Sequence, residues 1–203
     1  MQQVRARERR DSILEAALRV FARVGYHLAS VDAIAREART SKGGVYFHFP
    51  SKEAIFLLLL DRAATRLRIR AEAAIAAEVD PIAKLEAALW TVLDAFANHR
   101  ELARLLLVEG PAAAPAIRQR IATLHREFTS LIRDQLEAAV DAGAIPPVES
   151  ALVAQAWFGA LNELLTDWAQ ADQPFSLPEA FRALRRLFLR GIGVDPSCRA
   201  EQP

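Results

Sequence analysis

The sequence holds almost nothing from which covalent or metal cross-links could be built. Among its 203 residues there is a single cysteine, Cys198, close to the C-terminus. One thiol excludes an intramolecular disulfide and a multi-cysteine zinc site, and such scarcity suits a reducing compartment. Because 52% of the residues are hydrophobic, we expect the chain to fold through an apolar core, with Cys198 as a free thiol in the tail.

Long hydrophobic runs are also missing. The longest one, residues 55–60, is far shorter than the ~18 to 20 residues that a membrane span requires. The first ten residues carry four arginines with no apolar stretch behind them, which is not the pattern of a signal peptide. We therefore expect a soluble, cytoplasmic protein without a membrane partner.

Enzyme signatures are missing as well. The sequence has no nucleophile elbow, no phosphate-binding glycine loop after a strand and no metal-ligand pair on one helix. His99 and His125 are single histidines in helical segments. We expect no catalytic residue, no metal site and no cofactor, and therefore not an enzyme.

Strand signals are sparse, which favours an all-α fold. Alanine and leucine dominate, and apolar positions recur at intervals of three and four residues. The pattern predicts about nine helices, at residues 7–24, 31–38, 42–48, 52–77, 81–99, 101–108, 116–142, 149–171 and 177–192.

Small polar residues, glycine and proline mark the ends of these helices. Gly25 and Gly143 stand where helices end. Gly110-Pro111, Pro115 and Pro146-Pro147 predict breaks. Side chains that can cap exposed N–H groups precede five helices: Ser30, Ser41, Ser51, Asp80 before Pro81, and Ser176 with Glu179 in the capping-box spacing.

Charge is nearly balanced over the whole chain, at +1, but not along it. Residues 1–52 carry ten Lys and Arg against five Asp and Glu, and residues 53–203 carry sixteen against twenty. A basic N-terminal part followed by an acidic remainder is typical of a protein that binds nucleic acid with one part and has a separate function in the other. Solvated helix faces are the alternative explanation of the arginines.

The second and third helices, joined by a three-residue turn, have the proportions of a helix-turn-helix, whose second helix enters the major groove of DNA. Short helix pairs also occur in ordinary bundles, so the proportions leave both interpretations open. DNA with two-fold symmetry requires a protein with two-fold symmetry, and the DNA-binding interpretation therefore predicts a homodimer.

The residue types favour DNA binding, because residues 13–53 closely resemble the N-terminal signature of TetR-family regulators. The matching residues are Ile13, Ala16-Ala17, Phe21, Gly25, Ser30-Val31, Ile34-Ala35, Ala38, Ser41-Lys42-Gly43-Gly44-Val45-Tyr46-Phe47-His48-Phe49 and Ser51-Lys52-Glu53. One departure lies in the turn, where the family usually has glycine and an aliphatic residue but this chain has Arg39-Thr40. An arginine with positive φ would lose some stability and gain a cation near DNA.

This resemblance implies a helix-turn-helix DNA-binding domain at residues 1–52 and a ligand-binding and dimerisation domain at residues 53–203. Lys42 and the two small glycines would let the start of the third helix approach the groove, and Tyr46 and His48 face DNA unless they pack inside. The expected DNA-binding residues are Ser30, Thr40, Ser41, Lys42, Gly43, Gly44, Tyr46, His48 and Lys52. The expected mini-core residues are Phe21, Ile34, Ala35, Val45, Phe47 and Phe49. The arginines at 5, 7, 9 and 10 either form an arm on the DNA backbone or are disordered.

In TetR-like proteins the last two helices form a four-helix bundle with their twins. We expect the dimer seam here to include Phe158, Leu161, Leu165, Trp168, Phe181, Leu184 and Phe188. Gly159 would permit close approach of the helices. Burial within one protomer is the alternative for some of these residues.

Residues 158–168, together with residues 107–109, look like the C-terminal half of the fatty-acid-degradation regulators of this family, which respond to acyl-CoA. An acyl chain requires an apolar tunnel, and CoA phosphates require cations. The candidate ligand-binding residues are Leu89, Leu93, Phe96, Arg100, Arg104, Leu105, Arg118, Leu124, Phe128 and Trp157, with Arg120 and Arg126 as further cations. Plain core packing and solvated surface are the alternatives for most of them.

The combined expectation is a TetR-type repressor that binds a palindromic operator in double-stranded DNA and is released by a small hydrophobic inducer. Our first hypothesis for the inducer is a long-chain fatty acyl-CoA, in control of fatty-acid degradation genes. A regulator of an efflux or aromatic-catabolism operon with another hydrophobic inducer is the alternative within the family. A helical adaptor protein is the alternative outside it.

Overall fold

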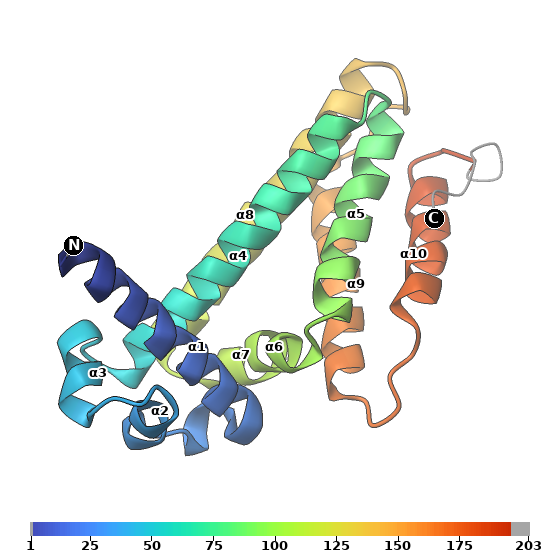
Figure 1. The fold of residues 1–203 in the computed structure, drawn as a ribbon. Coiled ribbons are helices and arrows are strands. Elements are labelled where there is room, and N and C mark those ends of the chain that lie inside the picture. The colour runs from blue at the N-terminus through green and yellow to red at the C-terminus, as the bar shows by residue number, and fades with distance from the viewer. Residues whose placement is uncertain (1, 196–203) are drawn as a thin grey trace. The chain divides into compact units, whose positions relative to one another are not determined.

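In the computed structural model, which describes residues 2–195 and side chains from Ala6 onwards, all regular secondary structure within that range is helical (Figure 1). The all-α prediction is confirmed. Cys198 lies outside the described residues, as does the side chain of Arg5. The helices are α1 (Gln2–Leu28), α2 (Val31–Glu37), α3 (Lys42–His48), α4 (Lys52–Ala77), α5 (Pro81–Ala97), α6 (Arg100–Arg104), the π-helix η1 (Leu105–Glu109), α7 (Gly110–Ala112), α8 (Pro115–Asp141), α9 (Ser150–Gln170) and α10 (Leu177–Gly191).

The helices form two compact units. The first contains residues up to 65 and residues 100–122, and the second contains residues 66–99 and those from 123 onwards. By packing, the start of α4 and residues 100–122 therefore belong with the helix-turn-helix. The functional division at residue 52, which was predicted from the sequence, stays a prediction.

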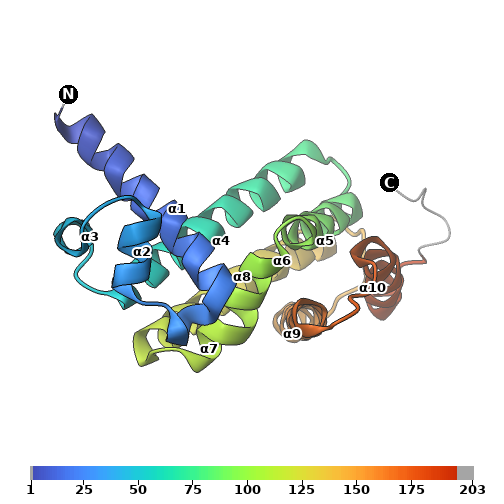
Figure 2. The same ribbon diagram turned by 60° about the horizontal axis from the view of Figure 1, so that its bottom comes forward.

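The core of the first unit is an aromatic cluster between α1 and α4. The rings of Phe21 and Phe56 meet edge to face at 5.6 Å, and those of Tyr26 and Phe56 at 5.0 Å. Phe21, Phe56, Ile13 and Ile34 are fully buried, and each such side chain contributes about 1.5 to 3 kcal/mol by leaving water. Figure 2 shows α2 between α1 and α3, and α2 contacts both of these helices.

Helix α1 is longer at both ends than the predicted 7–24. It begins at Gln2, and one further turn follows Gly25, whose φ of 79° and ψ of 165° interrupt the helical geometry. The predicted role of Gly25 is thus confirmed as the point where regular helix stops. Residues beyond it lead directly to α2.

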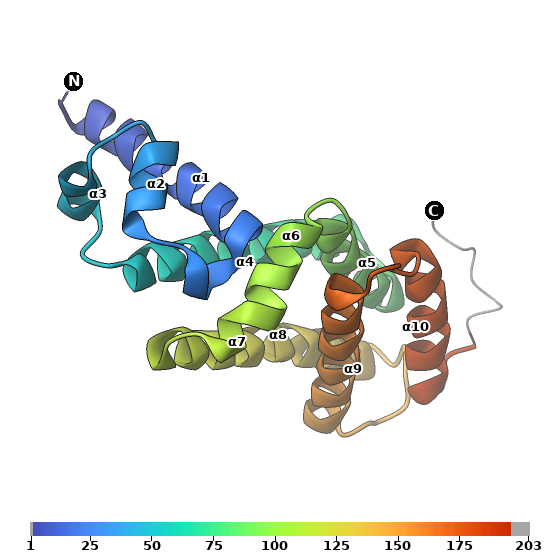
Figure 3. The ribbon, with the colours of Figure 1, turned by 90° about the horizontal axis from the view of Figure 1, so that it is seen from below.

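The predicted break at Gly110-Pro111 is wrong. The ribbon continues from α6 through η1 into α7 (Figure 3), because proline is tolerated in the first turn of a helix, where Pro111 lies. The chain leaves helical geometry only at Ala113. The helix predicted at residues 101–108 therefore includes a π-helical turn, Leu105–Glu109.

In the second unit, α5, α9 and α10 run side by side (Figure 1, Figure 2). The indole of Trp157 stacks on Phe188 at 4.6 Å, and it packs against an apolar cluster of buried residues. That cluster consists of Ile82, Leu85, Leu136, Ala139, Ile145, Ala154, Leu189 and Ile192. The capping box predicted for α10 is wrong, because the Ser176 side chain makes no capping hydrogen bond.

A buried ion pair joins α5 to α10. The Nε of Arg185 lies 2.9 Å from Oε1 of Glu86, and these side chains are only 5% and 8% exposed. The Nη2 atom of Arg185 is buried without a hydrogen-bond partner among the described residues. Removing either partner would leave an unpaired charge in the core, which is strongly destabilising.

Candidate DNA interface and ligand-binding residues

Serine side chains start both helices of the helix-turn-helix. The Oγ of Ser30 accepts a hydrogen bond from the Ala33 N–H at 3.1 Å, and the Oγ of Ser41 accepts one from the Gly44 N–H at 3.0 Å. Both residues have extended backbone geometry, as N-caps require. The predicted caps are confirmed, and these hydroxyls hold the two helix starts that were expected to meet phosphates.

The two glycines of α3 differ in their surroundings. A Cβ on Gly44 would lie 2.5 Å from Oγ1 of Thr40, so a larger residue there would require the Thr40 side chain to move. A Cβ on Gly43 would meet nothing closer than Oγ of Ser41 at 3.8 Å. Among the described residues, therefore, no neighbour explains the glycine at 43, whose bare backbone faces outward.

Lys42 at the start of α3 is paired within the protein. Its Nζ lies 2.8 Å from Oδ2 of Asp32 on α2, with both side chains about half exposed. The hydrogen bond between them lowers the pKa of Asp32 and raises that of Lys42. Both groups are thus charged at neutral pH, and Asp32 would compete with a DNA phosphate for the charge of Lys42.

Helix α3 has an inner and an outer face. Val45 and Phe49 are buried, as predicted, whereas Tyr46 is 46% exposed and His48 is half-buried. Phe47 was predicted to lie in the mini-core, and this is wrong: it is 83% exposed, with its ring edge to face against His48 at 5.1 Å. With about 3.6 residues in each turn, three successive aromatic residues of an α-helix point in different directions and cannot share one face.

Lys52 was expected to contact a phosphate, but in this structure its amino group binds backbone carbonyl oxygens of the protein itself. Its Nζ donates to the carbonyl oxygens of Tyr26 at 2.7 Å, Ala29 at 2.9 Å and His27 at 3.3 Å. It also lies 4.5 Å from the centre of the Tyr26 ring. Burial lowers the pKa of Lys52. Its amino group therefore fixes the segment between α1 and α2.

The arginines at the N-terminus lie on helix α1. Arg7, Arg9 and Arg10 are exposed, and the guanidinium of Arg10 lies over the Phe49 ring at 5.4 Å from its centre. The described part of this segment is therefore helical, and its contact with the DNA backbone stays a prediction.

The candidate ligand-binding residues are divided between the units. The second unit contains Leu89, Leu93, Phe96, Leu124, Phe128 and Trp157, and the first contains Arg100, Arg104, Leu105 and Arg118. Leu93, Leu105 and Leu124 are buried. Their role in binding a ligand stays a prediction.

Several of the arginines proposed for CoA phosphates already have partners within the first unit. Arg120 Nε lies 2.6 Å from Oδ1 of Asp61, and Arg118 Nη1 donates to the Ala113 carbonyl at 3.2 Å. Arg104 lies 3.8 Å from Glu109. Part of the hydrogen-bonding capacity of these cations is therefore already used within the protein.

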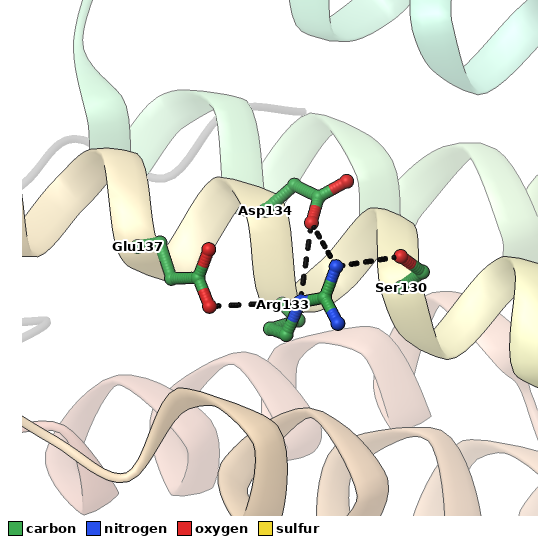
Figure 4. Close-up of polar contacts among 4 residues, drawn as sticks. All are labelled: Ser130, Arg133, Asp134 and Glu137. Atoms are coloured by element: carbon green, nitrogen blue, oxygen red, sulfur yellow. Dashed lines mark hydrogen bonds and ion pairs between the residues drawn. The ribbon is translucent and has the colours of Figure 1, made fainter.

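Arg133 on α8, which was not selected from the sequence, is held by its own helix (Figure 4). Its Nη2 donates to Asp134 at 2.8 Å and to Ser130 at 3.0 Å, and its Nε lies 3.5 Å from Glu137. The bond to Asp134 is the main reason that the pKa of Arg133 is raised. These contacts of the arginine are thus with neighbours on the surface of α8.

Most of the predicted dimer residues are buried within the second unit. Phe158 is half-buried, and the remaining six are at most 7% exposed: Leu161, Leu165, Trp168, Phe181, Leu184 and Phe188. Their part in a dimer stays a prediction, and their direct contact with a second chain would require them to leave this core. The outward faces of α9 and α10 carry other residues, among them Leu152 at 65% and Leu187 at 63% exposure.

Within residues 2–195, no group of three or more His, Cys, Asp or Glu is placed to hold a metal ion. None of the helices in that range is both long and apolar enough to cross a membrane.

Two family models match the chain. The model described as bacterial regulatory proteins of the tetR family matches residues 13–59, and the tetracyclin repressor-like C-terminal domain matches residues 78–192, more than half of the chain. The chain belongs to the TetR family. TetR-family members are DNA-binding transcription factors rather than enzymes. The family predicted from the sequence is thus confirmed.

Solved structures of TetR-family regulators share the whole fold. The fatty acid degradation regulator FadR from Bacillus halodurans has a TM-score of 0.83 and 25% identity, covering 91% of this chain and 96% of its own. FadR from Bacillus subtilis in complex with stearoyl-CoA has a TM-score of 0.82 and 26% identity, covering 89% and 98%. A comparison of sequences alone also finds an HTH-type transcriptional repressor from Streptomyces coelicolor. It is 36% identical over 138 residues, which cover 66% of this chain and 68% of its own.

The structural roles of two residues in this TetR-family regulator were not predicted from the sequence. Phe47 escaped because a phenylalanine between Tyr46 and His48 is most simply assigned to a core. Glu109, which accepts a hydrogen bond from the Tyr26 N–H at 2.7 Å, had no local signal at all, because its partner is 83 positions away.

Proposed function

We propose that this regulator is a repressor that binds a palindromic operator as a homodimer and releases it when a small hydrophobic inducer binds. The observation that carries the DNA-binding part is the outer face of α3. Lys42, Tyr46 and Phe47 are exposed there, and Gly43 presents bare backbone beside them. A cation, a phenol and an apolar ring on one helix suit phosphates, base edges and thymine methyl groups respectively.

The homodimer is supported by the outward faces of α9 and α10. Gly159 on α9 has open space where its Cβ would be, which would let a second helix approach closely. Exposed acidic residues lie on α9 and exposed arginines on α10, so α9 of one copy complements α10 of another. These charged residues are Glu163 and Asp167 on α9 and Arg182, Arg186 and Arg190 on α10.

A fatty acyl-CoA is our first choice of inducer, in control of fatty-acid degradation genes. Support comes from the two FadR structures, one of which holds stearoyl-CoA. The largely apolar α5, with Leu89, Leu93 and Phe96, supplies side chains of the type that an acyl chain requires.

Induction would be a shift between two populations of the dimer. The inducer favours a state whose recognition helices no longer match successive major grooves, with α4 carrying the movement because it belongs to both units. Moving the balance from 1:99 to 99:1 requires about 5.5 kcal/mol of differential binding.

DNA binding is tested with duplexes that the full-length chain selects from a random library. The double variant Lys42→Ala with Tyr46→Ala should lose selective binding while keeping its helical content. The matched control is Arg68→Ala with Ile69→Ala, which removes an exposed cation and an exposed apolar side chain from the second unit. If the wild-type chain enriches no duplex, or the Lys42/Tyr46 variant footprints the same one, the proposed DNA face is wrong.

The inducer is tested by titrating acyl-CoA of short, medium and long chain length into the complex with a selected duplex. Free CoA and free fatty acids are the controls. Release by acyl-CoA alone supports the proposal. If no chain length changes DNA affinity, acyl-CoA is excluded, and native mass spectrometry of ligand retained by the purified dimer then identifies another inducer.

A further inference from the structure

The turn between α2 and α3 ends α2 with a hydrogen-bond pattern that normally uses glycine. The Thr40 N–H donates to the Ala35 carbonyl at 2.9 Å, and the Arg39 N–H donates to the Arg36 carbonyl at 3.1 Å. These two bonds define a Schellman motif, whose residue after the C-cap adopts the left-handed conformation. That residue is Arg39, with φ of 51°.

Arg39 stands apart from the other left-handed residues of the chain. Among residues 2–195, the remaining positive φ values belong to Gly25, Gly143 and Gly193. A long L side chain is disfavoured in this region by contact between its Cβ and the backbone, whereas glycine adopts it freely. The chain thus carries a cation at a position where glycine would be the more stable choice.

No hydrogen bond or ion pair of the Arg39 side chain offsets this backbone strain within the described residues. It is exposed, and it makes no hydrogen bond or ion pair with any residue in the described range. The carboxylates of α2 are occupied elsewhere, since Asp32 pairs with Lys42 and Glu37 pairs with Arg19. The charge at 39 is therefore unneutralised, three residues before the start of α3.

We propose that Arg39 contacts a phosphate of the operator, and that this contact is why a strained arginine stands in the turn. The inference rests on the proposed DNA-binding function. Backbone strain that nothing inside the protein repays is typical of functional positions. A contact to phosphate adds affinity for duplex DNA of any sequence and leaves the preference among sequences unchanged.

The test compares Arg39→Gly with Arg39→Lys in the full-length chain. Arg39→Gly removes strain and charge together, so its Tm should rise by about 2 to 4 °C. Its affinity for both selected and random duplexes should fall by about eightfold at 0.1 M salt, and the log–log salt slope should become shallower by about 0.9. Arg39→Lys keeps the cation and the strain, so its Tm and salt slope should stay near those of the wild type.

Four results would contradict the proposal or the function on which it rests. A higher Tm with unchanged DNA affinity overturns the phosphate contact, because the strain then serves no binding. An unchanged Tm overturns the role of strain. Loss of affinity for the selected duplex alone indicates base reading and also overturns the proposal. A wild-type chain that enriches no duplex defeats the proposed function itself, a result that is seen before any variant is compared.

Discussion

The carboxylate of Glu109 accepts a hydrogen bond from the backbone N–H of Tyr26 at 2.7 Å, while Lys52 donates to the carbonyl oxygen of Tyr26, also at 2.7 Å. Both backbone groups of one residue are thus held by charged side chains, one from η1 and one from α4. Gly25 permits this approach, because a Cβ there would lie 2.7 Å from Oε2 of Glu109. The segment that leads into the helix-turn-helix is fixed from both sides.

Replacing Glu109 tests how much this contact stabilises the first unit. Glu109→Ala leaves the part-buried Tyr26 N–H without its acceptor, and we expect a loss of about 1 to 3 kcal/mol in the free energy of unfolding. Glu109→Gln keeps an oxygen acceptor and should lose less. Urea unfolding of the wild type and both variants measures these losses, and a Glu109→Ala variant as stable as the wild type would show that the hydrogen bond contributes nothing.

Replacing Asp32 should strengthen DNA binding. Asp32 has a lowered pKa and is ionised at neutral pH, so it competes with DNA phosphates for Lys42. We expect Asp32→Asn to raise affinity for a selected duplex by about two- to fivefold, the range that a single exposed ion pair provides. Fluorescence anisotropy at constant salt measures it.

Glu37→Gln is the matched control, because it removes one negative charge from the same helix but frees Arg19 and Arg23 instead of Lys42. Its affinity should change less than that of Asp32→Asn. Equal gains from both variants would mean that net charge, rather than release of Lys42, is responsible.

How far the sequence could predict this structure depended on how local each signal was. The serine caps at 30 and 41 act on N–H groups three residues away, and both were predicted correctly. The continuation of helix through Pro111 could not be predicted, because proline both breaks helices and begins them, and only the structure shows that Pro111 stands in the first turn of α7. The contact between Glu109 and Tyr26 joins residues that are 83 positions apart, so no local pattern in the sequence could predict it.

Phe47 should read a thymine methyl group. An 83% exposed phenylalanine on the outer face of α3 has no hydrogen bond to offer, so apolar contact is its means of recognition. Replacing thymines one at a time by deoxyuridine in a selected duplex removes single methyl groups. We expect about a fourfold loss of affinity at one position, the equivalent of one buried methyl.

The Phe47→Ala variant should lose that response, because its contact with the methyl group is already gone, and Phe47→Leu should keep part of it. A methyl-dependent loss of equal size in wild type and Phe47→Ala would assign the contact to another residue.

The buried pair of Glu86 and Arg185 should respond differently to single and double substitution. Glu86→Gln leaves the buried guanidinium without its counter-charge and should cost about 3 to 5 kcal/mol of unfolding free energy. Glu86→Leu with Arg185→Met replaces both charges by apolar groups of similar size and should be near neutral or stabilising. Urea unfolding measures all three proteins, and a double variant as unstable as the single one would show that the pair itself stabilises the fold.

The proposed dimer face predicts an unusual outcome for Gly159. Since nothing lies within 4 Å of its missing Cβ, Gly159→Arg fits the protomer and improves helix propensity by about 1 kcal/mol. The same arginine would block a second helix, so dimer affinity should fall by about thirtyfold or more, as at a central interface position. Sedimentation equilibrium measures this loss, and circular dichroism checks that the helices remain. The control is Ala138→Arg, which places an equal side chain at an exposed position of α8. If Gly159→Arg remains as dimeric as this control, the seam lies elsewhere on the molecule.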